Sequence, residues 1–167
     1  MSSGRRIVEI PIEKKIERIL VHRNMTVTTA ESCTGGMIAG TLVNADGISS
    51  VFKEGFITYS NEAKMKYLGV KKETLEKHGA VSRETAKEMA EGAAKAAGAD
   101  AAIAVTGIAG PGGGTAEKPV GLVYIGCVSG DNTIVKKCFY GGDRETVRRS
   151  AAKEALEILY CQILAGE

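Results

Sequence analysis

Apolar residues recur at two different spacings along the first third of the chain, and each spacing predicts a different element. From Ile12 to Val21 they fall three or four positions apart with charges between them, which predicts an amphipathic helix. Met25 to Thr29 is rich in β-branched residues and predicts a strand. Helical spacing returns from Met37 to Val43. The residues between that strand and that helix, up to Gly36, are therefore predicted to form a tight turn.

The middle of the chain has one aromatic-rich segment followed by segments with helical character. Val51 to Ser60 predicts a strand that is interrupted near Gly55. Asn61 is predicted to cap the helix that follows it. Three helices are expected in this part of the chain, over residues 62–68, 71–77 and 83–97, the last beginning after Ser82.

The last third predicts a buried strand, a long loop, a hairpin and a final helix. The strand is Ala101 to Val105, and the loop is Thr106 to Pro119. Val120 to Val128 and Thr133 to Tyr140 have the spacing of a hairpin, and Arg144 to Leu164 predicts an amphipathic helix. Since helices alternate with strands before the hairpin, we expect an α/β fold with a mixed β-sheet layered between helices, an α/β/α sandwich.

Composition narrows the class of protein. The 167 residues fit one domain, 1–167, whose residues 1–6 we expect to be frayed. A net charge of +2 is too small to favour nucleic acid or a membrane surface as partner. The chain has neither the apolar run of a signal peptide nor one approaching the ~20 residues of a membrane span. We therefore expect a cytoplasmic location with free thiols.

Cysteine and histidine spacing does not suggest a metal site. No Cys-x-x-Cys pair occurs, and the chain has only two histidines. We therefore expect no metal and no cofactor. The residues concerned are Cys33, Cys127, Cys138, Cys161, His22 and His78.

The predicted turn after the first strand is the first candidate for chemistry. Ser32 lies where backbone N–H groups of the following helix are unsatisfied and the helix dipole is positive, which favours an oxyanion or a phosphate. The alternative is that Ser32 or Thr34 merely caps the helix, while Gly35 and Gly36 relax the turn.

A second candidate pairs Tyr59 with Lys64. Tyr59 is at the end of a predicted strand and Lys64 is in the first turns of the next helix, so the two can reach one point in space. A neutral lysine can deprotonate a serine, but its pKa must fall from ~10.4 to ~7–8, which requires burial or a second cation nearby. The alternative is a solvated lysine beside a core tyrosine.

A third candidate is the glycine-rich loop from Thr106 to Thr115. Successive small residues allow backbone N–H groups to converge on an anion. The loop has no Gly-Lys-Ser/Thr sequence and precedes a hairpin rather than a helix, so neither a P-loop nor a dinucleotide fingerprint is predicted. A flexible surface loop is the alternative.

The start of the last predicted helix is the fourth candidate. Asp143 suits an N-cap, and Arg144 and Arg148 are one helical turn apart. Two arginines at this spacing are predicted to share a carboxylate or a phosphate. The alternative is a solvated helix start.

Together these segments resemble the CinA C-terminal domain family. The motifs that carry the resemblance are AESCTGG at 30–36, GFITYSNEAK at 55–64, and TGIAGPGGG at 106–114 followed by KPVG at 118–121. The resemblance covers nearly the whole chain but not the separate N-terminal domain of full-length CinA proteins, so a stand-alone form is expected.

The resemblance implies a nicotinamide-nucleotide amidohydrolase, also called an NMN deamidase, which takes part in pyridine-nucleotide salvage. Such an enzyme hydrolyses nicotinamide mononucleotide to nicotinate mononucleotide and ammonia. Ser32, Tyr59 and Lys64 match the family's catalytic residues, with Ser32 as nucleophile, Lys64 as base, and Tyr59 relaying the proton or holding Lys64. Oxyanion stabilisation is expected from the N–H groups of Cys33, Thr34, Gly35 and Gly36.

Substrate binding is assigned to the third and fourth candidates. The glycine loop and Arg144 are expected to hold the ribose phosphate, through Thr106, Gly107, Gly110, Gly112, Gly113 and Arg144. As partners we expect this small molecule and other copies of the chain in a homo-oligomer. The competing hypothesis is a non-catalytic, nucleotide-binding regulatory or competence-associated module, in which Lys64 is an ordinary surface cation.

Overall fold

A five-stranded sheet forms the centre of the molecule in a computed structural model that describes residues 9–166. The residues expected to be frayed, 1–6, lie outside the described part. The strand order is β2-β1-β3-β4-β5. The strands are β1 (Val27–Glu31), β2 (Phe52–Ile57), β3 (Ala101–Gly107), β4 (Leu122–Ser129) and β5 (Asn132–Phe139).

The sheet is mixed, as the sequence predicted. β1 pairs in parallel with both β2 and β3, whereas β3, β4 and β5 pair antiparallel. Glu31, the last residue of β1, is opposite Ile57 on one side and Val105 on the other. Because carboxyl ends of parallel strands meet at one edge, the residues that follow β1, β2 and β3 are brought together there.

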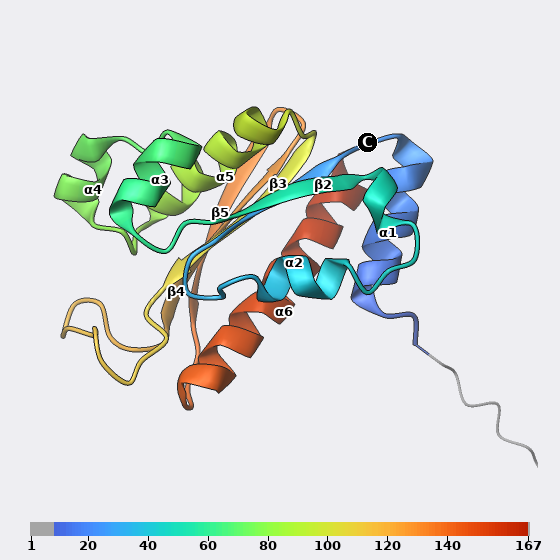
Figure 1. Cartoon of the computed structure of the whole chain (residues 1–167). Helices are drawn as coiled ribbons and strands as arrows, with labels where there is room; N and C mark the ends of the chain where they lie inside the picture. Colours follow the sequence, from blue (N-terminus) through green and yellow to red (C-terminus); the bar gives the residue numbers. More distant parts are fainter. Residues whose placement is uncertain (1–8, 167) are drawn as a thin grey trace, which may run out of the picture.

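Helices cover both faces of the sheet, which confirms the α/β/α sandwich (Figure 1). α1 (Ile12–Arg23), α2 (Met37–Leu42) and α6 (Arg144–Ala165) pack on one face, whose core includes Leu20, Ile38 and Leu159. The other face is covered by α3 (Asn61–Leu68), α4 (Lys72–His78) and α5 (Arg83–Ala97). A short 3-10 helix, Ile48–Ser50, precedes β2.

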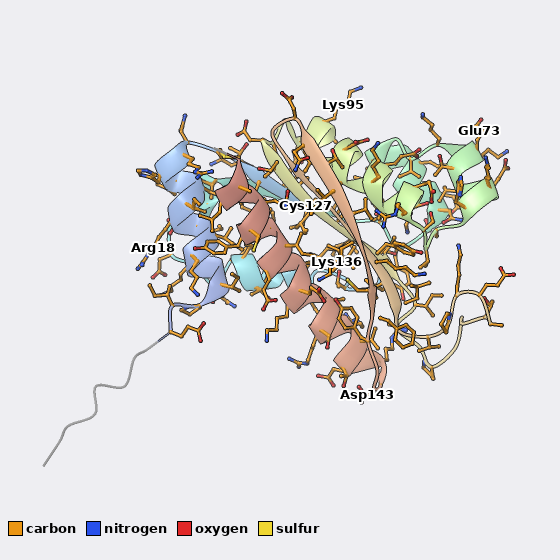
Figure 2. All side chains as sticks on the ribbon, turned by 180° about the vertical axis from the view of Figure 1, so that it is seen from behind. Arg18, Glu73, Lys95, Cys127, Lys136 and Asp143 are labelled. Carbon is orange, nitrogen blue, oxygen red and sulfur yellow. The ribbon has the colours of Figure 1, made fainter. Side chains whose placement is uncertain are left out.

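Viewed from behind, α1 and α6 lie side by side across their face of the sheet (Figure 2). Arg18 on α1 and Lys95 on α5 are exposed, and Cys127 lies buried between the helical layers. The four cysteines are unpaired, as expected, with Cys161 exposed. None of the helices within residues 9–166 is long and apolar enough to cross a membrane.

Two local predictions need correction. The predicted cap of α3 was Asn61, but Ser60 is the cap: its Oγ accepts a hydrogen bond of 3.1 Å from the Ala63 N–H, and Asn61 is the first helical residue. The expected interruption near Gly55 is not a break in β2. It is a register shift against β1 between Val27 and Thr29, which keeps the strand paired.

Candidate active site

A cavity of about 270 Å³ opens at the carboxyl edge of the three parallel-paired strands. Most of the site residues predicted from the sequence line this cavity, although they come from four distant parts of the chain. The turn residues Thr34, Gly35 and Gly36 do not line it. The predicted residues that do are Ser32, Cys33, Tyr59, Lys64, Thr106, Gly107, Gly110, Gly112, Gly113 and Arg144.

Lys64 and Ser32 contact each other at this cavity. The Lys64 Nζ donates hydrogen bonds to Ser32 Oγ at 3.1 Å and to the Thr58 carbonyl at 2.8 Å. Only 1% of the Lys64 surface is exposed, so the interpretation of a solvated surface lysine is wrong. Ser60 caps α3 four residues before Lys64. The first turn of this helix brings the Lys64 side chain to Ser32, the residue that follows β1.

Burial changes the charge state of this amine. Removal from water disfavours the ammonium form and lowers the Lys64 pKa to about 8. At pH 7 about one molecule in ten then carries a neutral amine, against fewer than about one in a thousand at the ordinary lysine pKa. The pKa of the adjacent Cys33 thiol moves the other way, to about 11, because burial disfavours its thiolate. Of these two neighbours, only Lys64 is suited to accept a proton near neutral pH.

The burial of Lys64 predicts that folding stability depends on pH. The unfolded chain keeps this proton up to about pH 10.5, whereas the folded protein loses it near pH 8, so stability should rise with pH across that window. Lys64→Met removes the titrating group. Relative to that variant, we expect the wild-type free energy of unfolding to increase by ~2–3 kcal/mol from pH 8 to pH 10.5 in urea titrations.

A lysine on the same helix provides the control. Lys66 is exposed, so Lys66→Met should keep the wild-type dependence on pH. A wild-type stability that runs parallel to that of Lys64→Met over this window would contradict the desolvation of Lys64.

Glu31 organises the turn after β1. Its side chain is fully buried, and its carboxylate accepts hydrogen bonds from the N–H groups of Gly36, Ile38 and Ala39 at 3.0, 3.1 and 2.9 Å. The α2 helix is therefore capped from the preceding strand, and the interpretation that Ser32 or Thr34 caps it is wrong. A carboxylate at this place also offsets the positive end of the helix dipole.

This arrangement corrects the expected set of oxyanion donors. The N–H of Gly36 already donates to Glu31, and that of Gly35 donates to the Ser32 carbonyl at 3.1 Å. Within residues 9–166 neither the Cys33 N–H nor the Thr34 N–H donates to a carbonyl or a carboxylate. Of the two, only Cys33 lines the cavity, so its N–H is the candidate donor to a negative oxygen formed beside Ser32, whereas Thr34 is fully buried.

Tyr59 lies at the mouth of the cavity rather than in the core. It is 63% exposed, and its hydroxyl accepts a hydrogen bond of 2.9 Å from Arg144 Nη2. The Nη1 of the same arginine donates to the Gly110 carbonyl at 2.8 Å. Arg144 thus connects the tyrosine with the glycine loop, and the contact that holds Lys64 comes from the Thr58 carbonyl instead of Tyr59.

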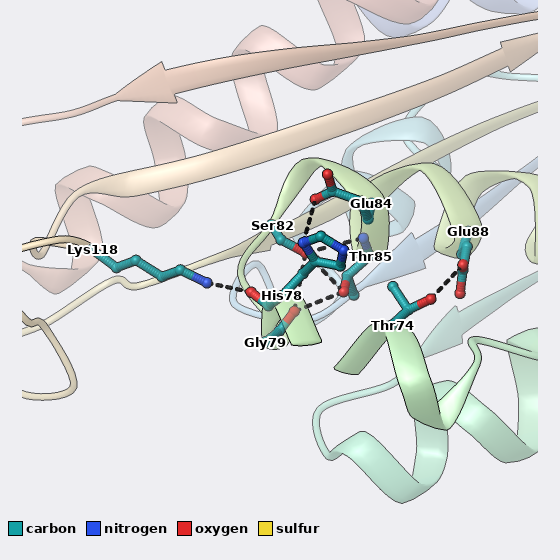
Figure 3. A network of polar contacts seen from close by, with 8 residues as sticks. All are labelled: Thr74, His78, Gly79, Ser82, Glu84, Thr85, Glu88 and Lys118. Atoms are coloured by element: carbon teal, nitrogen blue, oxygen red, sulfur yellow. Dashed lines mark hydrogen bonds and ion pairs between the residues drawn. The ribbon is translucent and has the colours of Figure 1, made fainter. Parts of the chain in front are cut away.

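The segment that contains the glycine loop is attached at both ends to the turn between α4 and α5. Thr106 Oγ1 donates to the Ala80 carbonyl at 2.8 Å, and Lys118 Nζ donates to the His78 carbonyl. Figure 3 shows Lys118 reaching across to the turn between α4 and α5, where Ser82 caps α5. These contacts hold the two ends of the segment, while residues 111–117 between them are exposed.

The two arginines of α6 donate to different segments of the site, and an anion shared between them stays a prediction. Arg144 faces Tyr59 and Gly110. Arg148, one turn later, donates from Nε to the Cys33 carbonyl at 2.9 Å and from Nη2 to the Thr34 carbonyl at 3.1 Å. Each arginine therefore fixes a different segment of the site.

Comparison with known proteins agrees with this architecture. The family model described as CinA C-terminal domain matches residues 9–163. The chain belongs to the CinA C-terminal domain family. A relative named as a competence-damage inducible protein, from Clostridium novyi, is 57% identical over 157 residues, which is 93% of this chain but 38% of that protein. The chain thus spans well under half the length of the curated relatives it matches.

Solved structures of the CinA family share the whole fold. The competence/damage inducible protein CihA from Agrobacterium tumefaciens is 46% identical, with a TM-score of 0.85 over 93% of this chain and 99% of that one. The competence damage-inducible protein A from Klebsiella pneumoniae is 38% identical, with a TM-score of 0.89 over 93% and 97%.

Several functional features of this CinA domain escaped the sequence analysis. Thr58 acts through its backbone carbonyl, which no side-chain pattern reveals. Ala80 and Val81 form part of the cavity wall but carry no chemical signal. Glu31 is part of the AESCTGG motif, and a single acidic residue at the end of an otherwise uncharged strand is a signal that could have identified it as a buried cap.

Proposed function

We propose that the chain hydrolyses the carboxamide of nicotinamide mononucleotide to nicotinate mononucleotide and ammonia, a step of pyridine-nucleotide salvage. The observation that supports this most directly is the 3.1 Å contact between Ser32 Oγ and the buried amine of Lys64 at a cavity. A serine beside a lysine of lowered pKa is an activated nucleophile and its base. Membership of the CinA family is compatible with this reaction.

In the first half of the proposed reaction, Ser32 attacks the carboxamide carbon. Neutral Lys64 takes the hydroxyl proton as the Oγ–C bond forms, and the carbonyl oxygen becomes an oxyanion. The N–H of Cys33, which lines the cavity, is the candidate donor to it. Lys64 then passes its proton to the amide nitrogen, the C–N bond breaks, and ammonia leaves.

The second half restores the enzyme. Water attacks the nicotinoyl ester on Ser32, and Lys64 accepts a proton from that water. Collapse of the second tetrahedral intermediate breaks the ester bond and returns the proton to Ser32 Oγ, which releases nicotinate mononucleotide. Lys64 thus ends each cycle neutral, in the state in which it began.

The rest of the cavity is proposed to bind the nucleotide. Arg144 supplies positive charge beside Tyr59 and the glycine loop, which suits a ribose phosphate. The Thr106 hydroxyl already donates to Ala80, so it offers the substrate only its lone pairs. Gly112 and Gly113 leave space for the ligand to approach the backbone, whereas a Cβ at Gly107 or Gly110, which also line the cavity, would meet Val123 or Val120.

The direct test is incubation of the purified protein with nicotinamide mononucleotide, measuring both ammonia and nicotinate mononucleotide. We expect the two products in equal amounts. Binding of the nucleotide without either product would instead support the non-catalytic regulatory module.

The same assay tests whether the activity requires a metal ion. Residues 9–166 contain no group of three or more His, Cys, Asp or Glu side chains that could hold a metal ion. Lys64 and the backbone donors already supply a base and oxyanion stabilisation, so EDTA should leave the rate within about twofold of the untreated enzyme. Loss of activity in EDTA that returns with zinc or magnesium would overturn this expectation.

A further inference from the structure

The cavity beside Ser32 carries positive charge and no carboxylate. Its charged side chains are Lys64, which is 1% exposed, and Arg144, which donates to the Tyr59 hydroxyl. Among residues 9–166, no Asp or Glu lines it. A ligand that enters therefore meets two cations. Only Lys64 can lose its charge near neutral pH, because burial lowers its pKa to about 8 whereas a guanidinium stays protonated.

The ionisable groups around the cavity do not supply the missing negative charge. Glu31 accepts from the N–H groups that begin α2, Glu62 is exposed, and the Cys33 thiol is neutral because burial raises its pKa to about 11. The acidic residues of α5, which packs against α3, and of the first turn of α6 each have a partner, as Figure 3 shows for the first two pairs. The pairs are Glu84 with His78, Glu88 with Thr74, Glu91 with Lys87, Asp143 with the Thr146 N–H, and Glu145 with Arg149.

The backbone of one cavity wall is also partly neutralised. Three consecutive carbonyls in the turn between α4 and α5 accept hydrogen bonds from side chains. The donors are Lys118 to His78, Ser82 and Thr85 to Gly79, and Thr106 to Ala80. Ala80 and Val81 of this turn line the cavity and are apolar. A flat aromatic ring can pack against such a wall, but a positive charge on the ring finds no anion there.

The proposed reaction brings such a charge to the cavity. In nicotinamide mononucleotide the carboxamide is attached to a pyridinium ring, whose nitrogen is positively charged. For attack, Ser32 Oγ must lie about 3–3.5 Å from the carboxamide carbon. Because Lys64 Nζ is 3.1 Å from that Oγ, the charged ring nitrogen then comes to roughly 5–8 Å from the amine.

We propose that the cationic ring of the substrate prepares its own base: its charge favours the neutral amine of Lys64, so the site is selective for carboxamides attached to a cationic ring. This inference deepens, and rests on, the amidase function proposed above. A like charge disfavours an ammonium ion, most strongly where both groups are out of water. The ring brings in the positive charge that Lys64 releases as a proton, so the two together carry one positive charge before and after binding.

The inference predicts how proton release and affinity depend on pH. The pKa of Lys64 is about 8 in the free protein, and in the complex we expect it to fall to roughly 7. Binding at pH 7.5 should then release about half a proton per site. By the same linkage, affinity should increase about fivefold from pH 7 to pH 9. The substrate phosphate, with its second pKa near ~6, is already ionised over this range.

The test is isothermal titration calorimetry of Ser32→Ala, which is expected to bind without turnover. Nicotinamide mononucleotide is compared with the isostere in which an uncharged benzamide ring replaces the pyridinium ring and the other groups are kept. Titrations in buffers of different ionisation enthalpy measure the protons released. We expect about half a proton for the cation and less than about a tenth for the isostere, whose affinity should stay constant from pH 7 to pH 9.

Two lysines of α3 provide matched variants in the same Ser32→Ala background. Lys64→Met removes the titrating group and should abolish proton release on binding of nicotinamide mononucleotide. Lys66 is exposed, so Lys66→Met should keep it. Proton release that persists in the Lys64 variant would assign the proton to another group and overturn the inference.

Turnover of the wild type gives a second readout. The pH profile of kcat/KM follows the free protein and that of kcat the complex, so the limb of kcat should lie about one pH unit lower. Equal proton release by the two ligands, or limbs that coincide, would overturn the inference and leave the amidase intact. Proton release on binding, with no ammonia formed by the wild type, would reject the amidase and leave the effect of the ring on Lys64 standing.

Discussion

Ser32→Ala should abolish release of ammonia from nicotinamide mononucleotide while the protein remains folded. The change removes one oxygen, and Lys64 keeps its hydrogen bond to the Thr58 carbonyl, so we expect stability to change by no more than about 1 kcal/mol. Loss of a nucleophile typically lowers turnover by ~10³–10⁶. The measurement is kcat, with circular dichroism and a urea titration as checks of folding.

A second serine provides the comparison. Ser50 is exposed and donates to the Gly47 carbonyl away from the cavity, so Ser50→Ala should keep wild-type turnover. If Ser32→Ala retained a tenth or more of the wild-type rate, a covalent mechanism through this serine would be wrong.

Lys64→Arg and Lys64→Met should both be nearly inactive, for different reasons. Methionine has no base, and arginine keeps the charge but cannot be deprotonated at neutral pH. Arginine also places a wider planar group where Lys64 is 99% buried. Because a positioned base contributes ~10²–10⁴, we expect kcat to fall by at least about 10² in each variant.

The pH profile of the wild type gives the same prediction a second readout. Only the neutral amine accepts the serine proton, so kcat/KM should rise with pH and level off above a pKa near 8. Lys66→Arg, on the exposed side of the same helix, should leave both the rate and this limb unchanged. Near-normal kcat in Lys64→Arg would remove the lysine base from the mechanism and assign its proton to another group.

The two readouts of Lys64 are physically linked. The burial that lowers its pKa and makes it a base also destabilises the folded protein at pH 7, where unfolding would let the amine recover its proton in water. Catalytic competence and stability are therefore expected to move in opposite directions in Lys64→Met. A buried lysine of this kind therefore lowers the free energy of unfolding near pH 7.

Local patterns were sufficient for most of the fold. The apolar spacing between Ile12 and Val21 identified α1, and the spacing and composition of the turn from Ser129 to Asn132 identified the hairpin of β4 and β5. Asp143 was correctly identified as the cap of α6, where it accepts from the Thr146 N–H. Such features are encoded within a few residues, because helix caps, turns and amphipathic faces depend on near neighbours.

The sequence alone also determined which residues were candidates for the site, but not how they meet. Ser32 and Lys64 are adjacent only because β1 and β2 run in parallel and end at one edge. The burial of Lys64, and hence its pKa, depends on contacts with Ser32 and the Thr58 carbonyl, which lie outside α3. Glu31 as the cap of α2 and Arg148 as the clamp on its turn likewise depend on contacts that only the tertiary structure creates. The spacing of apolar residues indicates which face of a helix or strand is buried. The residues that contact that face come from segments far away in sequence, so only the tertiary structure identifies them.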